Sequence, residues 1–302
     1  MGERDEGQGQ EQKEQVARRQ VPDAMPVVAL GGANGSLDSL GVLLSRVPRH
    51  SGLAYVAVLD IPADEESQTH DRLKRSTELP VILLSEGAER LRVDHVYVAP
   101  ATRSLRSLDG HLHLGDATAD SGGVLMIDHF FRTLADTHGP HAAGVVLGGW
   151  ESDGMVGIKR IKERGGLTVA QDPGEIEQSA ASRAAIATGM IDWVLPVEDI
   201  AGRVSEYFER ERTVRLPPEK EPRPSEARAA ASAQGGNDEA SLRDVLTFLR
   251  TRTGRDFACY KRATILRRIG RRMQVNGVDN LQDYLVCLRT RPGEAARCCR
   301  TC

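Results

Sequence analysis

The chain has 302 residues, of which 40% are hydrophobic, 27% are charged and only 4% are aromatic. This composition is ordinary for a globular chain and excludes a disulfide miniprotein, a collagen and a coiled coil. No apolar run approaches the roughly 18–20 residues of a membrane span, and the charged N-terminus lacks the apolar region of a secretory signal. We therefore expect a cytoplasmic protein with no membrane span.

Charge divides the chain into two parts. The residues from Ser241 onward carry 14 Lys and Arg against 5 Asp and Glu, whereas the rest of the chain carries 26 against 38. All five cysteines also lie after residue 258. This asymmetry predicts two units, of which the second has an acidic partner.

The composition of two segments predicts where the folded units begin and end. Residues 1–24 are rich in Gln, Glu and Arg without apolar periodicity, which indicates a disordered arm. Residues 212–240 are first Pro-rich and then rich in Ala, Ser and Gly, which is typical of a linker. Folded units are therefore expected over residues 25–211 and 241–302.

The first unit alternates strand and helix patterns, which predicts a doubly wound α/β domain with a mainly parallel sheet. Leu105–Leu114 alternates at period two around Asp109-Gly110, which predicts an added antiparallel hairpin. The second unit is expected to be a small all-α module with helices over 242–251, 265–275 and 281–288. In the first unit, strands are expected over 27–30, 54–59, 81–84, 96–98, 143–147, 167–170 and 193–195, and helices over 37–46, 66–76, 124–137, 155–164 and 180–188.

A glycine-rich turn follows the first strand. Residues 31–36 read Gly-Gly-Ala-Asn-Gly-Ser, at the end of a strand where open α/β sheets bind ligands. A phosphate cradle is one interpretation, although the spacing is not G-x-G-x-x-G and no P-loop Lys is present. The others are a structural turn in which Ser36 caps the next helix, and a nucleophile turn.

Residues 26–208 resemble the catalytic domain of the chemotaxis protein-glutamate methylesterases, the CheB family. The segments that match are IDHFFRTLA (127–135), GGLTVAQDP (165–173) and AAIATGMIDWVLP (184–196). The resemblance implies a Ser nucleophile after the first strand, a His base after the second, and an Asp that orients the His. These three positions fall on Ala33, Asp60 and Asp153, so only the last keeps the family residue.

The substitutions remove the chemistry that the resemblance implies. Ester hydrolysis by a triad needs a nucleophilic oxygen and a base within hydrogen-bond reach. Ala33 has no nucleophile, and a free carboxylate at Asp60 is a poor base for a hydroxyl. Residues 180–182, Ala-Ala-Ser, also replace the family's Gly-Met-Pro. We expect a methylesterase-like fold that has lost its esterase; the alternative is an active esterase with a non-standard nucleophile.

Other polar residues near these positions do not replace the missing groups. Ser36 is expected to cap a helix rather than attack an ester, and His70 to point away from the strand end. His129 is expected to pack or cap within its helix. Asp153, without its His, is expected to cap the helix that follows it, although Asp60 and Asp153 could instead bind a cation through hard oxygens. No histidine has a recognisable metal-ligand spacing, so neither a metal nor another cofactor is expected.

Residues 241–297 resemble the N-terminal helical domain of the chemotaxis receptor methyltransferases, the CheR family. The pattern is a Thr-Gly-x-Asp-Phe turn at 253–257, then Tyr260-Lys261, then an R-R-x-x-R-R-M helix. The resemblance implies docking of a basic helix face to an acidic, chemoreceptor-like partner. A solvated basic face is the alternative, and nucleic acid is not expected because no aromatic platform is present. The basic face consists of Arg267, Arg268, Arg271 and Arg272.

The final residues, Arg-Cys-Cys-Arg-Thr-Cys, depart from the pattern expected of that family. A zinc site at Cys298, Cys299 and Cys302 would lack a fourth ligand. We expect the truncated or frame-shifted end of a longer methylesterase–methyltransferase fusion, with exposed thiols that oxidise readily.

Overall fold

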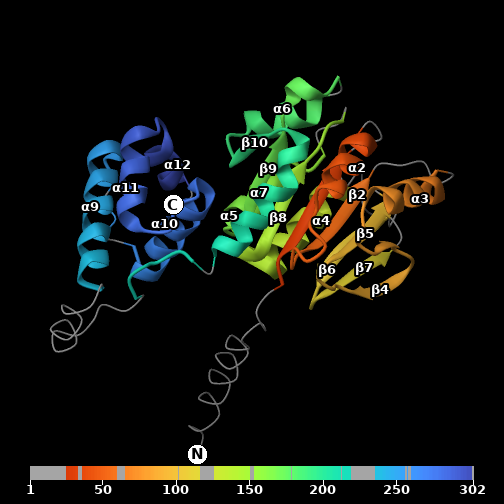
Figure 1. Cartoon of the computed structure of the whole chain (residues 1–302), viewed down its shortest axis with the longest axis horizontal. Coiled ribbons are helices and arrows are strands. Elements are labelled where there is room, and N and C mark those ends of the chain that lie inside the picture. The colour runs from red at the N-terminus through yellow and green to blue at the C-terminus, as the bar shows by residue number, and fades with distance from the viewer. Residues whose placement is uncertain are drawn as a thin grey trace, which may run out of the picture.

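The computed structural model describes residues 25–32, 36–59, 65–100, 102–115, 126–149, 153–177, 179–211, 213–218, 235–255, 257 and 260–300. The arm expected over 1–24, Ala33, Asp60 and Cys302 lie outside the described residues. Figure 1 shows two units side by side, an α/β unit and a helical unit.

The α/β unit is built on a seven-stranded, wholly parallel sheet in the order β10-β9-β8-β1-β2-β5-β3. The four neighbouring strands β8, β1, β2 and β5 consist almost entirely of buried residues, as expected for strands that are covered on both faces. The strands are β1 (Val27–Gly32), β2 (Ala54–Leu59), β3 (Val81–Leu83), β5 (His95–Pro100), β8 (Ala142–Val146), β9 (Leu167–Gln171) and β10 (Trp193–Leu195).

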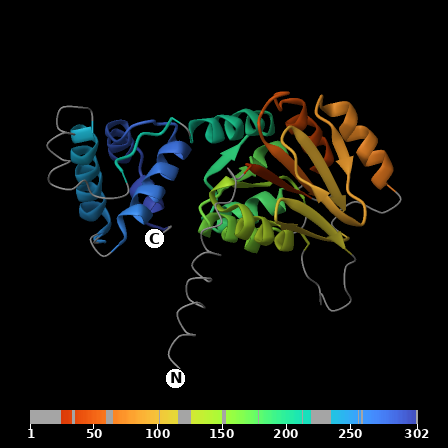
Figure 2. The same cartoon turned by 90° about the horizontal axis from the view of Figure 1, so that it is seen from below.

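Helices cover both faces of this sheet, and each face has its own core (Figure 2). On one face lie α2 (Leu37–Ser45), α3 (Glu66–Ser76) and α7 (Val197–Arg210). On the other lie α4 (Met126–His138), α5 (Met155–Glu163) and α6 (Ala180–Ala187). This arrangement confirms the predicted doubly wound α/β fold.

The predicted hairpin is present and belongs to a three-stranded antiparallel sheet in the order β4-β7-β6. Strands β6 (Ser104–Leu108) and β7 (His111–Gly115) are joined by Asp109 and Gly110, whose φ angles of 49° and 74° suit a tight hairpin turn. The third strand, β4 (Gly87–Arg90), was not predicted because it is largely exposed and has no apolar alternation.

The helical unit consists of α9 (Gly235–Thr253), α10 (Arg262–Asn276), α11 (Leu281–Thr290) and α12 (Glu294–Arg300) around one apolar core. Val214 and Leu216, which fall in the segment expected to be a linker, pack against that core. Helix α12 continues the fold into the Cys-rich tail. Cys298 is buried in the core, so the expectation of exposed thiols is wrong at this position.

In the described part of the chain, no helix combines the length and the apolar character needed to cross a membrane.

Candidate functional site

Three neighbouring strands of the large sheet, β8, β1 and β2, precede the positions that the sequence analysis assigned to a triad. Strand β1 lies between β2 and β8, with Gly32 beside Leu59 and Gly31 beside Val146. Since parallel strands end at the same edge, the turns after these strands converge there. Ala33 and Asp60 follow β1 and β2 directly, although their own placement is outside the described residues.

Asp153 is described, and its carboxylate caps a helix. Oδ2 accepts a hydrogen bond from the Ile127 amide at 3.0 Å, and Oδ1 accepts one from the Asp128 amide at 2.9 Å. These are amides of the first turn of α4, which have no partner within the helix. The sequence predicted a cap on the following helix, α5; the cap is instead on α4, which precedes Asp153 in the chain.

Asp128 of α4 caps the first turn of α5 in the same way. Its Oδ1 accepts a hydrogen bond from the Gly157 amide at 2.6 Å, in the first turn of that helix. Burial raises the pKa of Asp128, the Gly157 amide opposes this shift, and the nearby charge of Asp153 adds to it. The two aspartates therefore join the beginnings of α4 and α5, so Asp153 has a structural role in this fold.

Close packing explains the glycines at the end of β1. A Cβ on Gly31 would lie 2.7 Å from Ile127 Cγ2, and a Cβ on Gly32 would lie 2.1 Å from Ser36 Oγ. Ser36 is fully buried before α2, but its side chain makes no capping hydrogen bond, so the predicted cap is wrong. The structural interpretation of the turn thus rests on the two glycines and not on a Ser36 cap.

Two of the histidines that the sequence analysis singled out, His70 and His129, are among the described residues. His70 Nε2 lies 3.3 Å from the carbonyl oxygen of Val81, at the start of β3, so it points away from the carboxyl edge as predicted. His129 lies in α4, where burial and then the charges of Arg106 and Arg132 lower its pKa. No group of three or more His, Cys, Asp or Glu in the described part of the chain could hold a metal ion.

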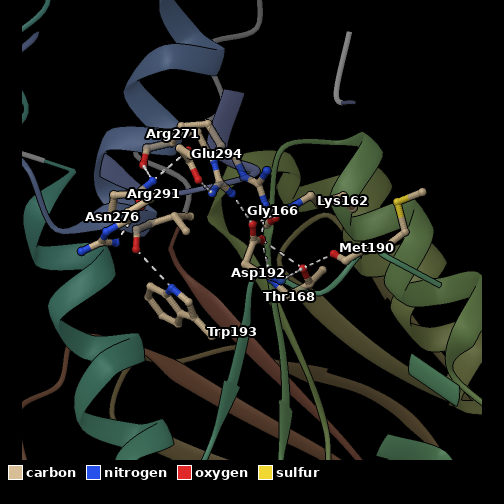
Figure 3. A network of polar contacts seen from close by, with 12 residues as sticks. Lys162, Gly166, Thr168, Met190, Asp192, Trp193, Arg271, Asn276, Arg291 and Glu294 are labelled. Carbon is tan, nitrogen blue, oxygen red and sulfur yellow. Dashed lines mark hydrogen bonds and ion pairs between the residues drawn. The ribbon is translucent and has the colours of Figure 1, made fainter. Parts of the chain in front are cut away.

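A second polar cluster lies at the opposite, amino edge of the sheet, where the two units meet (Figure 3). Asp192, just before β10, has a fully buried side chain and contacts three cations. Its Oδ1 accepts from Lys162 of α5 and from Arg272 Nη1 at 2.7 Å, and its Oδ2 accepts from Arg271 Nη2 at 2.7 Å. The Thr168 hydroxyl donates to Oδ2 at 3.0 Å.

Helix α12 completes this cluster. Arg272 is paired with Glu294 through Nε to Oε1 at 2.8 Å and Nη2 to Oε2 at 2.6 Å, a bidentate geometry that favours Arg over Lys. Tyr284 donates its hydroxyl to Glu294 Oε1 at 3.2 Å. Beside the cluster, Trp193 Nε1 donates to the Val275 carbonyl at 3.1 Å. Val275 of α10 also belongs to a core of the α/β unit, so the two units share apolar packing as well as charge.

The charges in the cluster shift one another's pKa values. Burial opposes ionisation of Asp192, yet Arg271, Lys162 and Arg272 together hold its pKa well below the usual range. Burial lowers the pKa of Lys162 to about 7, against the opposing effect of Asp192. The charges of Arg271 and Arg272 contribute to this lowered pKa, because three cations share this small volume with two carboxylates.

The structure separates the four arginines that the sequence placed on one docking face. Arg271 and Arg272 are buried in the interface between the units, with 8% and 2% of their surface exposed. They are therefore occupied within the chain and do not form part of an open basic face. Arg267 is exposed, and Arg268 lies partly exposed with its guanidinium 5.8 Å from the centre of the Tyr260 ring.

Sequence reasoning missed Asp192, Lys162 and Glu294. Asp192 carries a faint signal, since it is a lone acidic residue between Ile191 and Trp193 in an otherwise apolar run. A buried charge in such a run needs a partner. Lys162 and Glu294 carry no such signal because each stands in an ordinary amphipathic helix pattern.

The fold places this protein in the class of doubly wound α/β domains whose sites lie at the carboxyl edge of a parallel sheet. The family model described as CheB methylesterase matches residues 28–204, more than half of the chain. The chain belongs to the CheB methylesterase family. A second model, described as the all-alpha domain of CheR methyltransferase, matches residues 240–301, including the tail that seemed to depart from that pattern.

The chain is also similar to two curated proteins, one of which is named as a methylesterase. The chain is 34% identical over 186 residues to a protein-glutamate methylesterase/protein-glutamine glutaminase of Moorella thermoacetica, covering 58% of this chain and 42% of the relative. It is 33% identical over 225 residues to an uncharacterized 104.1 kDa protein of Rhodobacter capsulatus, covering 72% of this chain and 23% of the relative. The chain thus spans less than half of the length of either protein.

A solved structure supports the fold. The CheB methylesterase catalytic domain of Thermotoga maritima superimposes with a TM-score of 0.53 at 24% sequence identity. The match covers 60% of this chain and 97% of that domain. At this identity the likeness concerns the arrangement of the chain and not its chemistry.

Proposed function

We propose that this chain is a catalytically impaired CheB-type domain that binds a chemoreceptor-like signalling protein in the cytoplasm without hydrolysing its glutamate methyl esters. The observation that carries the proposal is the residue pair Ala33 and Asp60 at the family's nucleophile and base positions. The side chain of Ala33 is a methyl group without a nucleophilic atom, so it cannot form the acyl intermediate of triad chemistry.

The contacts of Asp153 support the proposal. Each of its two carboxylate oxygens accepts a hydrogen bond from an amide of α4, at 3.0 and 2.9 Å. This contribution to stability does not depend on an imidazole. A family carboxylate can therefore persist for structural reasons after the catalytic function has gone.

The helical unit contributes to assembly in this proposal. It contacts the amino edge of the sheet through Asp192 and Trp193, so the carboxyl edge remains the surface for a receptor-like partner. Of the basic groups proposed for docking, only Arg267 and Arg268 are available to an acidic segment. Arg271 and Arg272 hold the two units together.

Binding and turnover can be measured on the same preparation. A methylated receptor fragment is titrated into the full chain by calorimetry, and methanol release is then followed at neutral pH. The proposal expects saturable binding without methanol above the rate of the protein-free control. Methanol release by the unmodified chain would contradict it and favour the alternative, an esterase with a non-standard nucleophile. Absence of binding would also contradict it.

A further inference from the structure

A cavity of about 330 Å³ lies between the two units. One wall comes from the α/β unit: the end of α5 with the turn that follows it, Tyr207 and Glu211 at the end of α7, and the 3-10 turn Gly139–His141. The other wall comes from α10. Val214 and Leu216, in the segment that connects the two units, also line the cavity. This volume is at the lower end of the range of small-molecule sites.

The walls carry an excess of positive charge. The lining residues include two carboxylates, Glu163 and Glu211, and each of them has a basic neighbour. Glu211 lies 3.5 Å from His141, and Glu163 lies 3.6 Å from Arg160. The basic lining residues are His141, Lys162, Arg164, Arg267, Arg268 and Arg271.

The buried cluster beside the cavity is also short of negative charge. Among the described residues, the ion pairs of Lys162, Arg271 and Arg272 are with two carboxylates, those of Asp192 and Glu294. The Nε atom of Arg271, a lining residue, is buried and has no hydrogen-bond partner among the described residues. Burial lowers the pKa of Lys162, and the positive charge of Arg271 adds to this effect.

We propose that this cavity binds a small phosphorylated molecule that carries at least two negative charges. Guanidinium groups match phosphate oxygens with paired, charge-assisted hydrogen bonds, and three arginines reach the cavity from α10. The apolar surface of Pro140, Val214 and Leu216 would contact the organic part of such a molecule. Because both units line the cavity, the bound anion would also hold them together.

The test uses calorimetric titration of the full chain with inorganic pyrophosphate and, separately, with adenosine monophosphate, at one fixed ionic strength. At least one probe is expected to bind with a stoichiometry of one and to raise the melting temperature. Arg267→Gln with Arg268→Gln is expected to weaken this binding about tenfold or more, since hydrogen bonds to charged groups are lost. Arg164→Gln, on the other wall, is expected to weaken it as well.

Arg243→Gln with Arg289→Gln is the matched control. Both arginines are exposed, belong to the same helical unit and do not line the cavity. This pair is expected to leave the affinity within about twofold of the original. The melting temperatures of both double variants without ligand verify that each has folded.

Three results would overturn the proposal. One is the absence of saturable binding by both probes. Another is equal weakening by the two double variants, which would indicate attraction to net charge alone. The last is binding of a Glu-rich peptide that depends on Arg267 and Arg268 while neither phosphate probe binds, which would assign these arginines to an acidic protein segment.

Discussion

The two edges of the large sheet differ in what their charged residues do. At the carboxyl edge, Asp153, which the sequence analysis predicted at the position of a triad aspartate, makes the contacts of a helix cap. At the amino edge, Asp192 has no assigned position in a triad, yet it contacts three cations from both units. A position in a family pattern therefore does not by itself reveal the role of a carboxylate; its partners do.

The difference has a physical origin. Capping by Asp153 requires only two nearby amides, so it does not depend on a nucleophile or an imidazole. The Asp192 cluster requires two units in one chain, since Arg271 and Arg272 come from α10. A pattern drawn from either unit alone does not contain this interaction.

The largest loss of stability is expected when Asp192 is substituted. Asp192→Asn leaves Lys162, Arg271 and Arg272 buried without their shared anion, which should lower the free energy of unfolding by about 3–5 kcal/mol. Urea unfolding followed by circular dichroism measures this change. Asp71→Asn, at an exposed position of α3, is the control and should stay within about 0.5 kcal/mol of the original. If Asp192→Asn and Asp71→Asn both changed the free energy of unfolding by a similarly small amount, Asp192 would not have the stabilising role that distinguishes the amino edge from the carboxyl edge.

The second largest expected effect is a dependence of the free energy of unfolding on pH, which arises from Lys162. The pKa of Lys162 is about 7 in the folded chain and returns toward 10.5 on unfolding. Between these values the unfolded chain binds more protons, so this group makes stability rise with pH, by up to about 1.4 kcal/mol per pH unit. Below pH 7 both states are protonated, and this dependence disappears.

Unfolding measured from about pH 6 to pH 10 checks this expectation. The difference in unfolding free energy between the original chain and Lys162→Met should increase with pH above about 7, because the variant lacks the titrating group. Lys159→Met, at an exposed position of the same helix, should show a difference that does not change with pH. A flat difference for Lys162→Met would mean that the lysine is not buried beside Asp192.

The smallest loss of stability is expected when Asp153, at the carboxyl edge, is substituted. Asp153→Ala removes the cap on α4 and should lower the free energy of unfolding by about 1 kcal/mol. Asp153→Asn keeps one acceptor oxygen and should lose less. Thermal unfolding of the two variants measures the difference. A loss as large as that of Asp192→Asn would contradict the view of Asp153 as a helix cap.

Much of the fold could be predicted because local patterns agree with it. The buried strands are short apolar runs, and β2 begins and ends at the predicted residues, Ala54 and Leu59. Strand β4 was missed because its side chains are mostly exposed, so burial left no alternation in its sequence. Helix α12 was missed because its Cys-rich sequence indicated a non-native tail, although Glu294 and Cys298 are buried there.

The site was predictable only where residues act through a known motif. The positions of Ala33, Asp60 and Asp153 came from the resemblance to the methylesterases, and the contacts of Asp153 could not come from it. The basic residues of α10 were recognised as a group, but their division between an interface and a cavity depends on which side of the helix faces the α/β unit. That choice depends on Asp192, which lies 79 residues away from Arg271 in the chain.

The central claim is that the fold persists while its esterase chemistry is lost, and methanol release from methylated receptor fragments tests it most directly. The original chain is compared with the double reversion Ala33→Ser and Asp60→His, since loss of such groups costs several orders of magnitude in kcat. The account predicts methanol release by the revertant and none by the original chain. Release by the original chain at a comparable rate would contradict the account.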